Sequence, residues 1–262
     1  MANAARSLLR EPAVNGPIWA VSMVKNESDI VEETIQNLLD QGVDHILVAD
    51  NGSTDSTRAI LSRLSQAGRV HVVDDPIVAY WQGDKMSHLA RAATRMGAAW
   101  IVPFDADEMW KGEDGLTVAT VLRAAETNVV AASWWDFVPL AVVADGPIVR
   151  RFPYRRAAPH PQQKIAFRAN WLARISVGNH GVSLPDMRVG GGLRIAHFRT
   201  RTAAQVFRKA QDGIAARREV GGKDSSLPQW FVFEGKQEAD VADWMRQLVD
   251  GEDLVLDPAE LW

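Results

Sequence analysis

Three acidic side chains stand close together in the segment FDADEMW, residues 104–110, which follows the apolar run AAWIVPF. Asp105 and Asp107 are two residues apart, so on extended backbone their carboxylates point the same way. Carboxylates brought together repel one another and resist the loss of water unless a cation neutralises them. Mg2+ takes one or two protein carboxylates and fills its other positions with phosphate oxygens and water. We therefore expect Asp105 and Asp107 to share one metal ion beside a phosphate-containing ligand, rather than to form a solvated turn.

Two more polar clusters follow apolar segments in the same way. KNE, residues 25–27, comes after the apolar run PIWAVSMV, and DNGSTD, residues 50–55, comes at the end of HILVA. In an open parallel sheet, ligands bind beyond the carboxyl ends of the strands. These clusters are therefore expected to gather with the acidic segment at one edge of a sheet.

The elements that would position these clusters alternate along the chain. Apolar runs typical of buried strands alternate with segments of helical periodicity that end at a glycine. This alternation predicts an α/β fold with a mainly parallel sheet flanked by helices. Asp29 and Glu32 are expected to cap the first helix. The expected strands are 17–24, 44–50, 69–75 and 98–107. The expected helices are 28–42, the part of 51–68 that follows a turn, 84–97 and an amphipathic helix at 238–249.

Composition limits the class of protein. The chain has 262 residues, of which 47% are hydrophobic and 24% charged, as in a globular protein with a sizeable core. It has no cysteine, which excludes disulfides, thiolate chemistry and cysteine-ligated zinc. No apolar stretch is long enough to span a bilayer, and the first residues lack the order of a signal peptide. We expect a soluble, cytoplasmic protein.

Charge is segregated along the chain. Residues 1–146 hold 11 basic and 20 acidic side chains, residues 147–223 hold 16 and 3, and residues 224–262 hold 2 and 10. A basic middle segment indicates an anionic ligand or the protein's own acidic portions as its partner. The run GPIVRRFPYRRAAPHPQQ, residues 146–163, is expected to be a long loop that covers a ligand. The acidic end of the chain is expected to dock on this basic segment or on a second subunit in a homodimer.

The motifs together resemble a known family. VSMVKNESDIVEETIQNLLDQGVDHILVADNGSTDSTRAIL with the later FDADE is similar to the GT-A glycosyltransferases of family 2, in the branch with KNE, DNGSTD, DADE and HFR motifs. The resemblance covers the first 110 residues well and the rest only through QKIAFR, GNHGV and AHFRTRTAAQVFRKA. It implies a Rossmann-like nucleotide-sugar-binding half at 1–110, an acceptor half with a basic loop at 111–223, and an acidic helical tail at 224–262.

The activity implied is transfer of a hexosyl-type sugar from a UDP- or GDP-linked donor to a hydroxyl of a glycan or small-molecule acceptor. The resemblance favours inversion at the anomeric carbon and implies Mn2+ or Mg2+ as the cofactor. It implies no nucleic acid as a partner. Asp50 matches the acid near the base of the nucleotide, and Asn51 stands where the common pattern has a second Asp. Asp105 and Asp107 match the metal-binding D-x-D, and His197 is implied as a third ligand.

Other donor contacts follow from the same resemblance and from chemistry. Asn26 and Glu27 would hydrogen-bond the nucleoside, although Asn26 could instead cap the following helix. Basic groups near the diphosphate would stabilise the charge that builds on the leaving phosphate. Aromatic rings stack on the C–H faces of sugars. The candidates of these two kinds are Lys85, Lys164, Arg199, Arg201 and Lys209 for phosphate, and Trp81, Trp110, Trp134 and Trp135 for sugar.

Three residues compete as the general base that an inverting enzyme needs. His180 in GNHGV titrates in the right range and is flanked by glycines. Asp136 lies beside two tryptophans, where burial would raise the pKa of its carboxyl. Asp186 lies at the distance after the D-x-D at which family 2 enzymes place their catalytic Asp. We rank His180 first.

Two other functions fit parts of the pattern. A D-x-D beside a nucleotide also serves nucleotidyl transfer, whose product would be pyrophosphate rather than a nucleoside diphosphate. A nucleic-acid-binding module on the basic segment is the other alternative. The arginines of that segment are not interleaved with aromatic residues as stacking platforms would be, so nucleic acid is not the expected partner.

Overall fold

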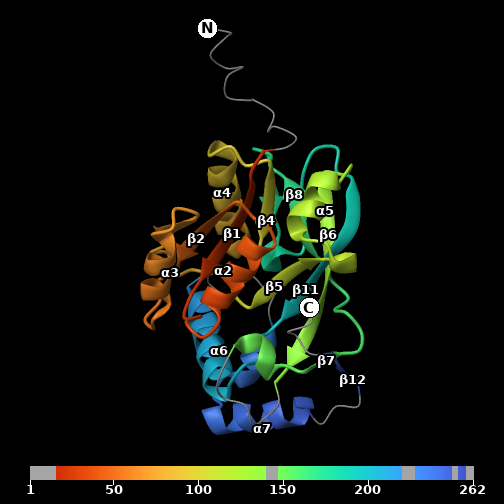
Figure 1. Cartoon of the computed structure of the whole chain (residues 1–262). Coiled ribbons are helices and arrows are strands. Elements are labelled where there is room, and N and C mark those ends of the chain that lie inside the picture. Colours follow the sequence, from red (N-terminus) through yellow and green to blue (C-terminus); the bar gives the residue numbers. More distant parts are fainter. Residues whose placement is uncertain (1–15, 140–146, 220–227, 250–252, 258–262) are drawn as a thin grey trace, which may run out of the picture.

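The computed structural model describes residues 16–139, 147–219, 228–249 and 253–257. Four parallel strands form one end of the sheet, in the order β3-β2-β1-β4 (Figure 1). Residues that the sequence predicted as buried strands build it, because each run is apolar on both faces. The strands are β1 (Ile18–Val24), β2 (His45–Asp50), β3 (Val70–Asp74) and β4 (Trp100–Pro103).

The second half of the chain extends this sheet with mixed pairing. β8 joins β4 in antiparallel fashion, β6 is antiparallel to β8, and β11 is parallel to β6 and antiparallel to β5. The predicted boundary at residue 110 falls inside β5, and strands from both sides of it share the one sheet. The strands are β5 (Glu108–Gly112), β6 (Val129–Val138), β8 (Lys164–Arg168) and β11 (Val189–His197).

Helices cover both faces of the parallel half. The α2 helix (Val31–Asp40), α3 (Thr57–Ser65) and α5 (Val118–Ala124) bury their apolar sides in the core on one face. The α4 helix (Gln82–Arg95) packs on the other face. Alternate residues of each strand serve the two cores, as the period of two in a strand requires. The fold is α/β, with a sheet flanked by helices on both faces, as the sequence predicted.

Two local predictions are wrong. Asp29 does not cap α2, whose N-cap residue Ile30 makes no side-chain bond, because Arg201 binds the Asp29 carboxylate instead. The segment expected as one long loop contains η3 (Ile148–Arg151) and the strand β7 (Tyr154–Arg156), which pairs with β6. In that strand the arginine side chains have acidic partners within the chain.

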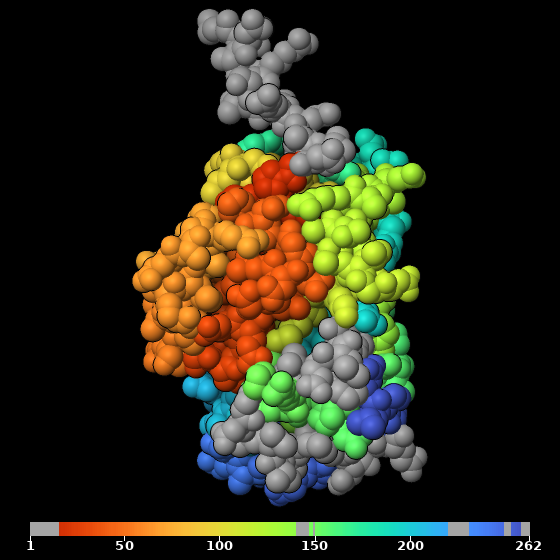
Figure 2. All heavy atoms as spheres, in the orientation of Figure 1, coloured from red at the N-terminus to blue at the C-terminus, as the bar shows by residue number. Residues whose placement is uncertain are grey.

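Residues 253–257 pack against the basic segment. The strand β12 (Leu254–Leu256) pairs with β7, and Arg155 Nε lies 2.7 Å from Asp257 Oδ2. Two helices precede it: α6 (Ala203–Arg218), and α7 (Glu238–Val249) with the bounds predicted from the sequence. Their atoms gather at the lower end of Figure 2, below those of the first 110 residues. Among the described residues, no helix is both long enough and apolar enough to cross a bilayer.

Candidate active site

Two carboxylates from neighbouring strands meet two cations from the C-terminal half. Glu27 follows β1 and Asp107 follows β4, so the strand-end rule places them together. Lys209 Nζ of α6 lies 2.6 Å from Asp107 Oδ2 and 2.8 Å from Glu27 Oε1. Arg201 bonds Glu27 and also forks onto Asp29, with Nε to Oδ2 at 2.7 Å and Nη2 to Oδ1 at 3.0 Å. These pairs hold five charged side chains in place at the carboxyl ends of the strands.

His197, at the end of β11, connects Asp107 to Asp136. Its Nε2 lies 3.6 Å from Asp107 Oδ1, and its Nδ1 lies 2.7 Å from Asp136 Oδ1. Burial lowers the pKa of His197, but the two carboxylates outweigh it and raise the pKa to about 9. Burial likewise raises the pKa of Asp107, yet Lys209, His197 and Arg201 hold it well below its usual range. The three side chains form one continuous charged chain.

Asp107 and His197 fit a divalent cation. A histidine whose second nitrogen bonds a carboxylate, as His197 bonds Asp136, is the usual arrangement behind a metal ligand. Within the part of the chain that the structure describes, no group of three His, Cys, Asp or Glu side chains is placed to hold an ion. Two protein ligands are enough for a cation that takes its remaining ligands from phosphate and water.

The structure corrects the expectation that Asp105 and Asp107 lie on extended backbone with their side chains pointing the same way. The backbone turns after Phe104, with Glu108 N bonding Asp105 O at 3.1 Å, so the two side chains are not on extended backbone. Asp105 Oδ2 pairs with Lys164 Nζ at 2.7 Å, and Asp105 Oδ1 accepts from Asn179 Nδ2 at 2.9 Å. Asp105 is therefore directed to a different set of partners from Asp107.

Lys164 is not free to bind a phosphate as predicted. Its ammonium lies 2.7 Å from Asp105 Oδ2, from Glu108 Oε1 and from the Gly178 carbonyl oxygen, and its side chain is only 5% exposed. Two hydrogen bonds, to Asp105 and Gly178, and an ion pair with Glu108 hold this ammonium within the protein. Burial raises the pKa of Glu108 to about 7 although Lys164 opposes the shift. Lys164 therefore links residues of the site to one another.

Asn26 joins three segments rather than capping a helix. Its backbone is left-handed, with φ of 54°. Its Oδ1 accepts from Thr54 N at 2.8 Å and from Asp55 N at 3.3 Å, and its Nδ2 donates to Asp212 Oδ2 of α6 at 2.8 Å. The KNE segment, the DNGSTD turn and α6 are thus fixed to each other.

The residues predicted to meet the nucleotide base form a separate corner beyond β2 and β3. Asp50 is buried, and its Oδ1 accepts from Ser53 N at 3.1 Å. Asn51 Nδ2 donates to Asp75 Oδ2 at 2.8 Å, and Lys85 Nζ pairs with the same oxygen at 2.7 Å. Asp50, Asn51 and Lys85, the last of which was predicted at the phosphate, are therefore brought to one place.

The three candidate bases lie in different surroundings. His180 Nδ1 is 3.2 Å from the Gln163 carbonyl oxygen, so the ring donates there and keeps its lone pair on Nε2. Burial and the charge of Lys164 lower the pKa of His180. A ring that is neutral at pH 7 with a lone pair on Nε2 meets the chemical requirement for a base.

The other two candidates are not placed for that role. Burial raises the pKa of Asp136, but its bond to His197 and the charges of His197 and Arg199 lower it overall, contrary to the sequence prediction. Asp186 lies beside the start of β6, where its carbonyl accepts from Asn128, at the opposite end of this strand from Asp136. The distance along the chain misled the sequence analysis, because β11 returns between Asp186 and the site.

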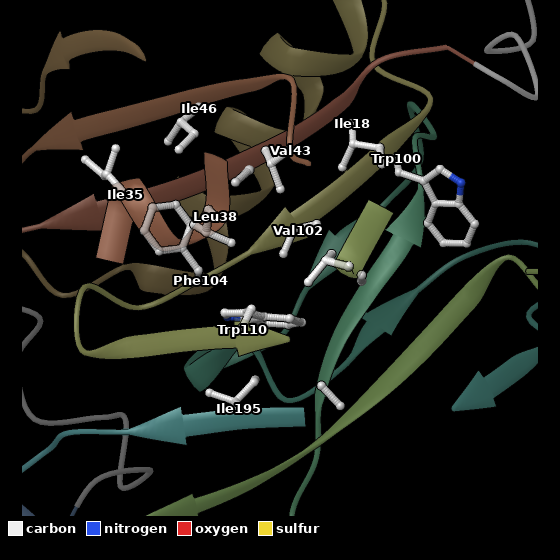
Figure 3. Packing of buried hydrophobic residues seen from close by; sticks show 14 of the residues in the cluster. Ile18, Ile35, Leu38, Val43, Ile46, Trp100, Val102, Phe104, Trp110 and Ile195 are labelled. Atoms are coloured by element: carbon white, nitrogen blue, oxygen red, sulfur yellow. The ribbon is translucent and has the colours of Figure 1, made fainter. Parts of the chain in front are cut away.

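Trp110 is a core residue and not a sugar platform. Its side chain is fully buried, and Figure 3 shows it among Phe104, Val102 and Ile195. Trp134 is also buried and stacks on His160, with ring centroids 3.9 Å apart. Trp81 remains exposed over half of its surface at the start of α4. Only Trp81 of these three has the exposure that stacking on a sugar requires.

Sequence reasoning missed three polar residues that complete the site. His160 stacks on Trp134, and its Nδ1 accepts from Gln162 N at 3.1 Å. Gln82 Oε1 accepts from Gly178 N at 2.8 Å, and Asn179 donates to Asp105. His160 and Gln82 lie outside the acidic and glycine-rich motifs. Only the glycines of GNHGV gave a local sign of the turn to which Asn179 belongs.

Comparison with known proteins gives the family. The model for glycosyl transferase family 2 matches residues 20–169, more than half of the chain. The chain therefore belongs to glycosyl transferase family 2. No curated protein matches the chain. The family match covers Asn26, Glu27, Asp50, the D-x-D segment and Lys164, and it stops before His180 and His197.

Solved structures resemble the chain distantly. Residues 1–349 of S. aureus TarS align with 11% identity over 75% of this chain and 65% of that one, at a TM-score of 0.45. The same fragment in complex with UDP-GlcNAc aligns with 9% identity over 75% of this chain and 66% of that one, at a TM-score of 0.45. GalNAc-T7 with UDP, GalNAc and Mn2+ aligns with 10% identity over 70% of this chain and 44% of that one, at a TM-score of 0.43. The chain spans less than two thirds of the length of these proteins, and the similarity is too low to transfer a ligand or an activity.

Proposed function

We propose that the chain is an inverting, metal-dependent transferase that moves a sugar from a UDP- or GDP-linked donor to a hydroxyl of a glycan or small-molecule acceptor. The observation that carries the proposal is the group formed by Glu27, Asp107, His197 and Lys209. It joins carboxylates, an imidazole and an ammonium beyond the carboxyl ends of β1 and β4. Family 2 membership supports sugar transfer as the reaction of that group.

The donor would lie along the strand ends. The nucleoside would meet Asp50, Asn51 and Lys85, which share one corner beyond β2 and β3. The diphosphate would meet Lys209, whose ammonium already lies between two carboxylates. An ammonium near the leaving phosphate stabilises the negative charge that builds there as the bond to the anomeric carbon breaks.

Asp107 and His197 would hold Mn2+ or Mg2+, and Asp136 would orient the His197 ring. When bound, the cation supplies positive charge to the departing diphosphate. Binding at His197 requires the ring to lose the proton that Asp107 and Asp136 favour, so it depends on pH. Arg201 pairs with Glu27 and Asp29, and its Nη1 lies 3.7 Å from Asp107 Oδ2. Its role would therefore be to hold these carboxylates in position rather than to bind phosphate.

His180 would take the proton of the acceptor hydroxyl through Nε2. Its hydrogen bond to the Gln163 carbonyl fixes which nitrogen carries the lone pair. The lowered pKa keeps the ring neutral and ready to accept a proton at pH 7. One base and direct attack on the anomeric carbon give inversion, whereas retention in the product would contradict a single-base scheme.

The first test is calorimetric titration of the protein with UDP and with GDP, each in the presence of Mn2+ and of EDTA. We expect one nucleotide to bind only with the metal, and Asp107→Ala to lose that binding. Asp84→Ala is the matched control, because Asp84 is exposed in the first turn of α4. Absence of binding by either nucleotide in the presence of metal would remove the main support for this donor class.

Product analysis separates the remaining alternative. Release of a nucleoside diphosphate from a cleaved donor indicates sugar transfer, and release of pyrophosphate from a nucleoside triphosphate indicates nucleotidyl transfer. For the sugar product, the configuration at the anomeric carbon relative to the donor is read by NMR. We expect a nucleoside diphosphate and the inverted anomer.

A further inference from the structure

The turn that carries His180 is held in an unusual conformation. Gly178 and Asn179 are both left-handed, with φ of 76° and 58°, within the short helix η4 (Val177–Asn179). A left-handed Asn costs energy and persists where surrounding contacts enforce it. A Cβ at Gly178 would lie 2.6 Å from His180 Nε2, so the imidazole packs directly against the turn. The position of the ring therefore depends on what holds this turn.

The contacts that hold the turn come from the D-x-D segment and its partners. Asn179 Nδ2 donates to Asp105 Oδ1 at 2.9 Å, and Lys164 Nζ donates to the Gly178 carbonyl at 2.7 Å. Gln82 Oε1 accepts a hydrogen bond from Gly178 N at 2.8 Å, and Gln82 Nε2 donates to Asp105 Oδ1 at 3.4 Å. The N–H and the carbonyl oxygen of Gly178 are thus each hydrogen-bonded to a side chain that also bonds Asp105.

Charge strengthens this link. Asp105 and Lys164 form an ion pair at 2.7 Å, and the lysine side chain is 5% exposed. Hydrogen bonds to charged groups are about twice as strong as those between neutral groups. The carboxylate fixes the ammonium, the ammonium fixes the Gly178 carbonyl, and the same carboxylate fixes Asn179.

We propose that Asp105 is a positioning residue for His180, acting through Lys164 and Asn179, while Asp107 alone of the D-x-D pair serves the donor. The inference rests on the proposed function, because it assigns a role within the same site. It connects the residue that would deprotonate the acceptor to the segment that follows β4. Loss of Asp105 then displaces the base and leaves the nucleotide in place.

The test combines a spectroscopic reading of His180 with nucleotide binding. Protein labelled with 15N in its histidine rings is compared as wild type, Asp105→Ala and Asn179→Gly, and His180→Gln assigns the ring signals. The second variant removes the contact to Asp105 at a backbone position where glycine relieves the left-handed conformation, so it is expected to fold. Asp84→Ala is the control, because its side chain is exposed on α4.

We expect both variants to lose the single Nδ1–H tautomer of His180, with UDP or GDP affinity in Mn2+ changed less than about twofold. The control is expected to leave the tautomer and the affinity unchanged. Unchanged His180 signals in both variants overturn the proposal. Unchanged signals with a loss of nucleotide affinity of about tenfold, or about 1.4 kcal/mol, in Asp105→Ala assign Asp105 to the donor instead.

A mixed result is decided by the second variant. If Asp105→Ala changes His180 and also loses nucleotide affinity, Asn179→Gly decides, because it leaves Asp105 in place. Changed His180 signals in that variant support the link, and unchanged signals overturn it. Failure of the donor hypothesis itself is visible in the wild type, which would then bind neither nucleotide, while the His180 comparison still reports on the role of Asp105.

Discussion

Replacing Arg201 by Met should destabilise the protein far more than replacing a surface arginine. The Arg201 side chain is fully buried and bonds Asp29, Glu27 and the Phe198 carbonyl oxygen at 3.0 Å. Methionine keeps much of the apolar volume but supplies no donor. The substitution therefore leaves buried carboxylates without one of their cations.

The magnitude follows from the burial of the pair. Removing one partner of a buried ion pair costs about 3–5 kcal/mol. For a chain of 262 residues, each kcal/mol lowers the melting temperature by about 2 °C, which gives a decrease of about 6–10 °C. Arg63→Met is the matched control, because Arg63 pairs with Glu32 where about half of each side chain is exposed. Such a surface pair contributes about 0–1 kcal/mol.

The assay is thermal unfolding followed by circular dichroism, with urea unfolding to give the free energies. We expect Arg201→Met to melt several degrees below Arg63→Met under the same conditions. Equal melting temperatures for the two variants would refute the reasoning, because Glu27 and Asp107 would then be shown to need no cation from Arg201.

Three further predictions concern pH and packing. Burial and the neighbouring His71 lower the pKa of His45 from 6.5, so His45 takes up a proton more readily in the unfolded state. The free energy of unfolding should therefore fall as pH drops below 6.5. Urea titrations should show a smaller loss in His45→Gln. Trp110→Ala should lower the free energy of unfolding by about 3–5 kcal/mol in the same titrations, because Trp110 is buried. Trp81→Ala should leave it almost unchanged, because Trp81 is half exposed. Equal losses in the two variants would contradict the assignment of Trp110 to the core. Because burial and Lys164 lower the pKa of His180, the rate of sugar transfer in saturating Mn2+, where protonation of His197 does not limit metal binding, should fall as pH drops through that lowered pKa, and His180→Gln should remove this acid limb; an unchanged pH profile in the variant would exclude His180 as the base.

Sequence reasoning predicted the frame of the site because strand ends obey a general rule. The apolar runs before Glu27, Asp50 and Asp107 identified three strands of one parallel half-sheet, and such strands present their carboxyl ends at one edge. The α7 helix, Glu238–Val249, was predicted to the residue from its apolar periodicity. These features depend on interactions between residues close in sequence.

Direction and burial were not predictable from spacing. Asp105 and Asp107 were expected to point together, but the turn that begins after Phe104 separates them. Trp110 follows an acidic motif and was expected at the ligand, whereas β5 turns its side chain into the core. Asp186 lay at the expected distance along the chain, and the course of β11 places it at the far end of the sheet.

The sequence by itself determined the α/β frame and the kinds of charged group at its edge, because both arise from local periodicity and residue type. Only the tertiary structure decided which carboxylate meets which cation. Asp107 and Lys209 are 102 residues apart in the chain, and Asp105 and Lys164 are 59 apart. A buried carboxylate is stable only with a partner, and the partner is chosen by the packing of α6 and β8 against the strand ends rather than by neighbours in the sequence.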